Sequence, residues 1–408
     1  MIRHLIFLLI LAAGITLPWG RSVPPSAAAS PGIPAGRDIG RLIGEADALV
    51  AADPEGRTVL SIHADKMLLP ASTLKILTAL VARHYLGPGH RYKTEVYLDS
   101  RNNLAIKGYG DPLLISEVIR EICKNVAERT REFNDLIVDG SYFSTVTIPG
   151  VTDTVNPYDA PCGALSVNFN TVNFKRSGRG YVSAEPQTPI VPFIHGRIRK
   201  TGLSEGRIVL SAENGESTLY AGHLFRRFLA DAGAASTGAV KKGTVETGRD
   251  RLLYRYTSVF TLDEIIERLL MHSNNFMANQ LLITAGIAAK GPPGTLRNGV
   301  SAADAYIRTV LNRDDIRIAE GSGISRENRI TAACMMRILA AFTPHHHLLR
   351  EEDGVYFKTG SLSGVRTRAG YIRGAGGGLS PFVVMLNTPG KRPEPVVSGL
   401  ARLLGGAN

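Results

Sequence analysis

The sequence pattern changes between about Arg91 and Tyr256, and this change constrains the fold more than any other feature. Within that segment, short β-like runs such as TEVYLD, LIVDG and GRIVLS are separated by Gly, Pro and Asn. Such runs predict strands joined by turns. One amphipathic run, LYAGHLFRRFLADAG, predicts a helix among them. We therefore expect an inserted, mostly β domain at residues 91–256.

The two flanking segments carry patterns that complement each other. Before the insertion, Ala48–Ala51 and Val59–Ile62 predict a hairpin that leads into an apolar helical run. After it, TLDEIIERLLMH predicts a capped helix, the runs GVYFKTG, VRTRAGYIRG and PFVVMLN predict three strands, and PEPVVSGLARLL predicts a last helix. We therefore predict one α/β (α+β) domain made of residues 39–90 and 257–408, which the insertion interrupts.

The N-terminus resembles an export sequence. Arg3 precedes an apolar run from Leu5 to about Trp19, and three alanines follow at residues 27–29. This pattern predicts a secretory signal peptide at residues 1–29, with an uncleaved N-terminal membrane anchor as the alternative. Residues 30–38 then form a linker. We expect the protein to be exported, to a periplasmic or other extracytoplasmic location.

The chain is basic, with a formal net charge of +11. The cations are scattered, and no cluster resembles a nucleic-acid motif, so we expect no nucleic-acid partner. For an exported protein, a basic surface favours an anionic envelope polymer or a membrane surface.

No residue pattern indicates a metal site or a cofactor. Cys123, Cys162 and Cys334 lack the spacing of metal ligands, and three cysteines cannot all pair within one chain. Two alternatives stay open: one disulfide between two of these cysteines, or three buried free thiols. The run at residues 345–347 is three consecutive histidines, which point in different directions and lack convergent partners.

The segment PASTLK places Ser72 one helical turn before Lys75. An ordinary helix-capping serine would explain Ser72 alone. A buried lysine beside it is costly, however, unless it has partners or loses its proton. A neighbouring base that takes the hydroxyl proton is what a serine nucleophile requires.

Two further motifs favour the catalytic interpretation. HSNNFMANQLL contains Ser273 and Asn275 between two helical patterns, and YFKTGSL contains Lys358, Thr359 and Gly360 on a predicted strand. Each motif is weak alone. The order Ser-x-x-Lys, Ser-x-Asn, Lys-Thr-Gly, each in its expected structural context, is a strong indication of an active site.

With these motifs, the chain resembles the low-molecular-mass penicillin-binding D-alanyl-D-alanine carboxypeptidases and endopeptidases that carry a large insertion between the first two motifs. Here Ser273 follows Lys75 by 198 positions. KGYGDPLL, IVDGSYF, ALSVNFN and GSGISRENRIT are similar to further signatures of that family. The resemblance implies a β-lactamase/transpeptidase-like domain with a central antiparallel sheet flanked by helices. It also implies peptidoglycan stem peptides as substrates and β-lactams as covalent inhibitors.

The resemblance assigns a role to each motif residue. Ser72 is the nucleophile, Lys75 the general base and Ser273 the proton relay, while Asn275 holds the substrate amide. The terminal carboxylate is bound by Lys358, Thr359 and Ser361, and Gly360 leaves room for the peptide. For a diaminopimelate side chain, Arg326 is expected to bind the carboxylate and Asp159 the amine.

Three substitutions and one short segment depart from the family pattern. Glu320 stands in place of Asp, Ser361 in place of Thr, and Asn279 in place of a frequent Glu. Only 32 positions separate Arg326 from Lys358, so a groove-lining segment is shortened and the substrate preference stays open. Two alternatives remain: a β-lactamase, although no Glu-x-x-Leu-Asn motif supplies a deacylation base, and a peptidoglycan-binding protein with vestigial catalytic residues.

Overall fold

The computed structural model describes residues 37–152 and 156–405. The predicted signal peptide and residues 30–36 of the predicted linker lie outside these ranges. None of the helices in the described ranges has the length and apolar character needed to cross a bilayer.

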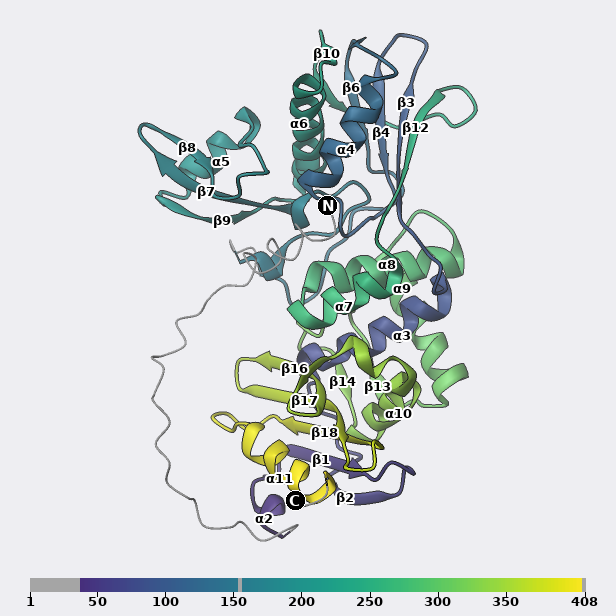
Figure 1. Cartoon of the computed structure of the whole chain (residues 1–408), viewed down its shortest axis with the longest axis vertical. Coiled ribbons are helices and arrows are strands. Elements are labelled where there is room, and N and C mark those ends of the chain that lie inside the picture. The colour runs from purple at the N-terminus through teal and green to yellow at the C-terminus, as the bar shows by residue number, and fades with distance from the viewer. Residues whose placement is uncertain (1–36, 153–155, 406–408) are drawn as a thin grey trace. The chain divides into compact units, whose positions relative to one another are not determined.

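The described residues form two compact units (Figure 1). The boundaries predicted for the inserted domain are not tested by this division and stay a prediction. Unit 1 contains residues 37–73, 270–273 and 330–405, and unit 2 contains residues 74–152, 156–269 and 274–329.

Unit 1 contains one six-stranded sheet. Its strands are β1 (Asp47–Ala52), β2 (Thr58–Ile62), β15 (Arg350–Glu352), β16 (Val355–Leu362), β17 (Val365–Arg373) and β18 (Leu379–Leu386). The order is β15-β16-β17-β18-β1-β2, and every neighbouring pair is antiparallel. The predicted N-terminal hairpin and the three predicted C-terminal strands therefore join one antiparallel sheet, as expected.

Helices cover both faces of this sheet. On one face, Leu49 and Val384 pack with Val397 and Leu400 of the C-terminal helix α11 (Glu394–Leu404), which also contacts the short helix α2 (Arg37–Arg41). Helix α10 (Ala332–Phe342) packs on β1, β17 and β18. Strand β1 is buried along its whole length, which explains its apolar sequence from Ala48 to Ala52.

Unit 2 contains a five-stranded sheet in the order β11-β6-β4-β3-β12. Helices α4 (Ser116–Ala127) and α6 (Glu216–Asp231) pack against each other, α6 packs on β6 and β11, and α4 packs on β12 (Figure 1). The strands are β3 (Lys93–Leu98), β4 (Leu104–Gly108), β6 (Leu136–Asp139), β11 (Val240–Lys242) and β12 (Arg251–Thr257).

A second, smaller sheet in unit 2 has the order β8-β7-β9. Its strands are β7 (Thr171–Ser177), β8 (Gly180–Ser183) and β9 (Glu205–Val209), and the short helix α5 (His195–Lys200) lies between β8 and β9 in the chain. Phe174 of the sheet and Ile198 of α5 are both fully buried. A single apolar layer therefore supports this small subdomain.

Three helices of unit 2 pack on one another: α3 (Lys75–Leu86), α8 (Asn275–Lys290) and α9 (Leu296–Tyr306). Helix α3 ends at Gly87, which has a φ of 78° and provides the predicted stop. Helix α7 (Leu262–His272) begins with the predicted capping box, in which the Thr261 backbone N–H donates to Glu264 Oε2 and the Glu264 N–H donates to Thr261 Oγ1.

The remaining elements are short. They are η1 (Ala71–Leu74), β5 (Glu132–Phe133), η2 (Pro157–Asp159), η3 (Asn168–Asn170), η4 (Pro192–Ile194), η5 (Glu213–Gly215), β10 (Ala235–Ser236), η6 (Ile307–Leu311), β13 (Ile316–Arg317), β14 (Arg329–Ile330) and η7 (Thr343–Leu348).

The prediction of one helix in the inserted segment is wrong, because the segment contains α4 and α5 as well as α6. In α4, Val118, Ile122 and Val126 recur every four residues and are buried. This spacing is helical. Charged residues between them interrupt the apolar run, and we therefore did not predict a helix here.

Candidate active site

Ser72 lies on η1, at the point where the chain turns into α3. Ala71, just before it, is buried and has a φ of 48°, an uncommon value for a residue with a side chain. The carbonyl oxygen of Pro70 accepts two hydrogen bonds of 2.7 Å, from the hydroxyls of Thr73 and Thr367. These bonds fix the backbone before Ser72 against β17, as expected for a side chain that must be held in one position.

Gly360 on β16 lies against this same backbone. A Cβ atom at Gly360 would come within 2.9 Å of the Ser72 nitrogen and the Pro70 oxygen, and within 2.2 Å of Thr367 Oγ1. Any side chain would therefore displace either the strand or the nucleophile. We predicted that Gly360 leaves room for the approaching peptide, whereas in the structure the backbone of Ser72 needs this space.

Lys358 precedes this glycine by two residues and is almost fully buried. Its Nζ donates a 2.8 Å hydrogen bond to the carbonyl oxygen of Thr359. Within the described ranges, no carboxylate forms an ion pair with it. Burial lowers the pKa of Lys358 to about 7, so the ammonium can lose its proton near neutral pH. Thr359 and Ser361 are exposed on the same strand.

The outer edge of β16 is open beside these residues. Strand β15 pairs only with Val355–Phe357, and among the described strands none pairs with Lys358–Leu362 on that side. An unpaired strand edge presents N–H and C=O groups that an extended peptide can bind by strand addition. The Lys-Thr-Gly segment therefore offers a backbone template next to Ser72.

Lys75 is the first residue of α3 and is fully buried. Its Nζ donates hydrogen bonds of 2.8 Å to Asn275 Oδ1 and 2.7 Å to the carbonyl oxygen of Ser322. Asn275 also donates from Nδ2 to the Tyr158 carbonyl oxygen at 3.4 Å. The first and second motifs therefore meet within unit 2. Ser72 precedes Lys75 by three residues, on the 3-10 turn η1 that leads into α3.

A buried carboxylate, Glu320, holds the loop that supplies the Ser322 carbonyl. Its oxygens accept hydrogen bonds from the backbone N–H groups of Ser322 and Gly323, at 2.6 and 2.7 Å. They also accept from the amides of Asn279 and Asn328, at 3.0 and 2.8 Å. Sequence reasoning did not identify this network.

The network joins two of the departures from the family pattern. Asn279 Nδ2 donates to Glu320, and Asn279 Oδ1 accepts from the Gly321 N–H at 2.7 Å. The two substituted positions are therefore direct hydrogen-bond partners, across 41 positions of the sequence.

The remaining predicted residues are Ser273, Arg326 and Asp159. Ser273 is partly exposed, has a φ of 54° and follows the last residue of α7. Arg326 is exposed on the loop after Glu320, and Asp159 is partly exposed at the end of η2. The structure places these side chains but does not test their roles.

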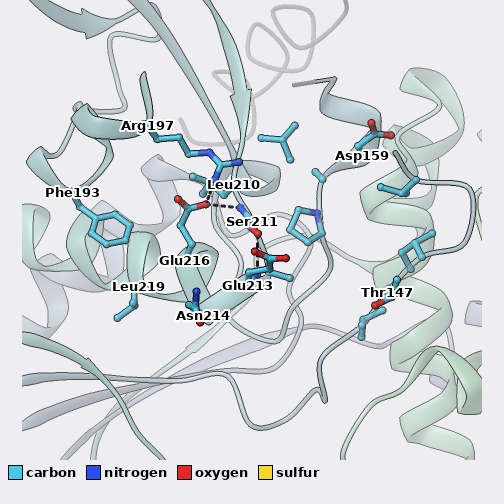
Figure 2. A pocket seen from close by; sticks show the side chains of 17 residues that line it. Thr147, Asp159, Phe193, Arg197, Leu210, Ser211, Glu213, Asn214, Glu216 and Leu219 are labelled. Carbon is cyan, nitrogen blue, oxygen red and sulfur yellow. Dashed lines mark hydrogen bonds and ion pairs between the residues drawn. The ribbon is translucent and has the colours of Figure 1, made fainter. Parts of the chain in front are cut away.

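Asp159 borders a cavity of about 880 Å³ in unit 2. Figure 2 shows Asp159 and Thr147 on one side of the cavity, across from the ion pair between Arg197 and Glu216. That pair has an N–O distance of 2.8 Å, and Glu216 also accepts from the Ser211 N–H at 2.6 Å. Asp159 Oδ2 accepts a hydrogen bond of 3.4 Å from Thr152 Oγ1, beside this cavity.

The three cysteines are free and buried, which decides between the alternatives left open above. Burial raises the pKa of the Cys123 and Cys162 thiols, which disfavours the reactive thiolate. In the part of the chain that the structure describes, no group of three His, Cys, Asp or Glu side chains could hold a metal ion.

Comparisons with known proteins agree with the motifs. The family model "D-Ala-D-Ala carboxypeptidase 3 (S13) family" matches residues 36–189 and 193–351. A D-alanyl-D-alanine carboxypeptidase of Actinomadura sp. (strain R39) is 25% identical over 429 residues, which span 85% of this chain and 78% of the relative.

Solved structures show the same fold. Penicillin-binding protein 4 of Haemophilus influenzae aligns with a TM-score of 0.73 and 20% identity, over 90% of this chain and 97% of that protein, and it has also been solved with a β-lactam. A predatory peptidoglycan endopeptidase of Bdellovibrio bacteriovorus aligns with a TM-score of 0.53 and 16% identity, over 88% of this chain and 93% of that one. Since the family model covers most of the sequence, the protein belongs to the D-Ala-D-Ala carboxypeptidase 3 (S13) family and is a serine-type DD-peptidase.

Proposed function

We propose that this peptidase hydrolyses the terminal D-Ala-D-Ala bond of peptidoglycan stem peptides through an acyl-enzyme on Ser72. The observation that carries the proposal is the position of Lys75. Its amine is fully buried and held by two neutral oxygens, Asn275 Oδ1 and Ser322 O. Burial favours the neutral form of an amine, which is the form that accepts a proton.

The bond changes follow from these positions. Ser72 Oγ attacks the carbonyl carbon of the penultimate D-Ala, and its proton passes to Lys75. The C–N bond to the terminal D-Ala then breaks, and the leaving amine receives a proton through Ser273. Water attacks the resulting ester, which releases the shortened peptide and restores the Ser72 hydroxyl.

The third motif binds the substrate. The peptide lies along the open edge of β16, and its terminal carboxylate contacts Lys358, Thr359 and Ser361. The backbone N–H groups of Ser72 and Ser361 form the oxyanion hole, where one donor contributes roughly 3 kcal/mol in other enzymes. The close approach of Gly360 to the Ser72 nitrogen supports this arrangement.

The pKa of Lys358 predicts a descending limb in the pH profile. With a pKa of about 7 in the free enzyme, the ammonium that binds the carboxylate is lost as the pH rises, so substrate binding weakens about tenfold per pH unit above 7. An arginine at this position stays charged throughout. We expect the ratio of kcat/KM between the wild type and Lys358→Arg to fall from pH 7 to pH 9, with KM changing more than kcat.

The measurement is kcat/KM for an acyl-D-Ala-D-Ala peptide between pH 5.5 and 9.5 in both proteins. The ratio cancels pH effects that both proteins share. A ratio independent of pH would show that Lys358 does not bind the carboxylate as an ammonium that titrates in this range.

The diaminopimelate subsite remains a proposal. Arg326 carries an exposed guanidinium and Asp159 faces a cavity, so a carboxylate and an amine on one side chain could both be bound. We also propose that β-lactams acylate Ser72. We propose export to a periplasmic or other extracytoplasmic location and contact with an anionic envelope polymer or membrane surface, because peptidoglycan is the substrate and the chain is basic.

The experiment that tests the activity compares two substrates. The purified protein is incubated with a linear stem pentapeptide and with a cross-linked muropeptide dimer, and products are identified by mass spectrometry. Release of D-alanine from the pentapeptide supports the carboxypeptidase, and conversion of the dimer to monomers adds the endopeptidase. Absence of both, in a protein that benzylpenicillin still acylates, would refute the proposed substrate.

A further inference from the structure

The small sheet β8-β7-β9 of unit 2 carries a disproportionate share of the positive charge. Residues 171–209 contain seven Lys or Arg and two Glu, a net charge of +5 in a chain whose total is +11. Two of the cations are neutralised by ion pairs, Arg197 with Glu216 at 2.8 Å and Arg207 with Glu185 at 2.9 Å. The other five are considered below.

These five cations lie at the end of β7, in the turn after it, and at the end of α5. Lys175, Arg176 and Arg179 surround the turn from β7 to β8, and Arg199 and Lys200 end helix α5. The loop after α5 returns to the first group, because the backbone N–H of Arg176 donates a 2.6 Å hydrogen bond to the carbonyl oxygen of Ser204. We call these five residues the basic tip.

All five side chains of the basic tip are exposed. Within the residues that the structure describes, none of them forms an ion pair. Glu205 is the one acidic residue among the neighbouring strands at this end, where it lies opposite Lys175 in the pairing of β7 with β9. The basic tip keeps a net charge of +4 with Glu205 included. A surface salt-bridge network, the usual role of such charges, is therefore not its role.

Two large apolar side chains are exposed beside these cations. Val182 is 41% exposed and lies directly opposite Lys175 in the pairing of β7 with β8. Leu203 is 44% exposed and precedes Ser204, the partner of Arg176. Cations and exposed aliphatic side chains together are the composition that binds the interface of an anionic bilayer.

We propose that the basic tip is a docking surface for a membrane that contains anionic phospholipids. The ammonium and guanidinium groups bind the lipid phosphates, while Leu203 and Val182 enter the boundary between headgroups and acyl chains. A soluble anionic polymer matches the charges but has no hydrocarbon layer for the two apolar side chains, so the lipid surface fits more of the site. The catalytic residues take no part in this contact.

Vesicle binding by three proteins with the same N-terminus tests the proposal. The first is the wild type. The second carries Arg176→Glu, Arg179→Glu and Lys200→Glu. The third is a matched control that carries Lys124→Glu, Lys242→Glu and Lys290→Glu, three exposed lysines elsewhere in unit 2 that give the same change in net charge. Equal acylation by benzylpenicillin shows that all three are folded.

We expect the wild type to sediment with phosphatidylcholine vesicles that contain phosphatidylglycerol, to bind pure phosphatidylcholine much more weakly, and to dissociate at high salt. Each cation near an anionic surface strengthens binding about fivefold, so the tip variant should bind at least about 100-fold more weakly. The control should change by less than about threefold, because its three lysines are not part of the basic tip.

A fourth protein, Leu203→Ser, separates insertion from charge. We expect about tenfold weaker binding to the anionic vesicles with no change in the salt dependence. Equal losses in the tip variant and the control would refute a local surface, since net charge alone would then explain binding. Binding of the wild type to soluble polyphosphate but not to vesicles would also overturn the proposal in favour of an anionic polymer.

Discussion

Replacing Ser72 by alanine is expected to abolish both peptide hydrolysis and covalent labelling by benzylpenicillin. The substitution removes the only atom that forms the acyl bond, so turnover should fall at least about 10⁴-fold, the order seen when a serine nucleophile is lost elsewhere. Stability should change little, because Ser72 is partly exposed and its neighbours Pro70, Thr73 and Thr367 keep their hydrogen bonds. Mass spectrometry of the labelled protein gives the result directly.

The control for this variant is Ser100→Ala, an exposed serine remote from the motifs in the sequence. It should label like the wild type, with one penicillin per chain on the peptide that contains Ser72. Labelling of Ser72→Ala at a wild-type rate would place the nucleophile elsewhere and refute the mechanism. Loss of labelling together with a lowered melting temperature would instead indicate damage to the fold.

The sequence predicted the catalytic motifs because their chemistry depends on residue types at short spacings. Ser72 and Lys75 are one helical turn apart, and their helix was visible from its apolar stripe and its end at Gly87. The strand that carries Lys358 was predicted from its composition. Such local patterns can be recognised from the sequence alone because they do not depend on distant partners.

Features that depend on distant partners were not predictable. Lys75 and Ser322 are bonded across 247 positions, and Lys75 and Asn275 across 200. Glu320 was noted only as a departure, although it accepts hydrogen bonds from several backbone and side-chain groups of its own loop and from Asn279. Nothing in the local sequence reveals which buried carboxylate accepts hydrogen bonds from these donors.

In the fold, too, local elements were predictable from the sequence and contacts between distant residues were not. The N-terminal hairpin was predicted from its turn residues, but the pairing of β1 with β18 joins residues more than 300 positions apart. The helix at Ser116–Ala127 was missed although its apolar positions have helical spacing, because charged residues stand between them; in the structure this helix packs against α6.

Replacing Lys75 by methionine is the second substitution with a very large expected effect. Methionine has a similar unbranched shape but cannot take the proton of Ser72. A general base contributes roughly 10²–10⁴-fold to catalysis, so the rate of acylation by benzylpenicillin should fall by that factor while the Ser72 hydroxyl remains present. The exposed Lys124→Met on α4 should acylate normally. Stopped-flow measurement of acylation gives the three rates.

Effects on stability and on catalysis can be separated at Lys75, because Asn275 Oδ1 and Ser322 O, which accept from its amine, are neutral. Loss of the amine leaves Asn275 Oδ1 and Ser322 O without that donor, at a cost of about 1–3 kcal/mol for each unsatisfied buried group. Removing a buried amine offsets part of this cost. The smaller variant Lys75→Ala leaves space for an added alkylamine, which should restore acylation in proportion to its concentration and basicity. If neither substitution slows acylation in a folded protein, the base is another group; if both slow it and the amine restores only Lys75→Ala, the proton acceptor is the amine at position 75.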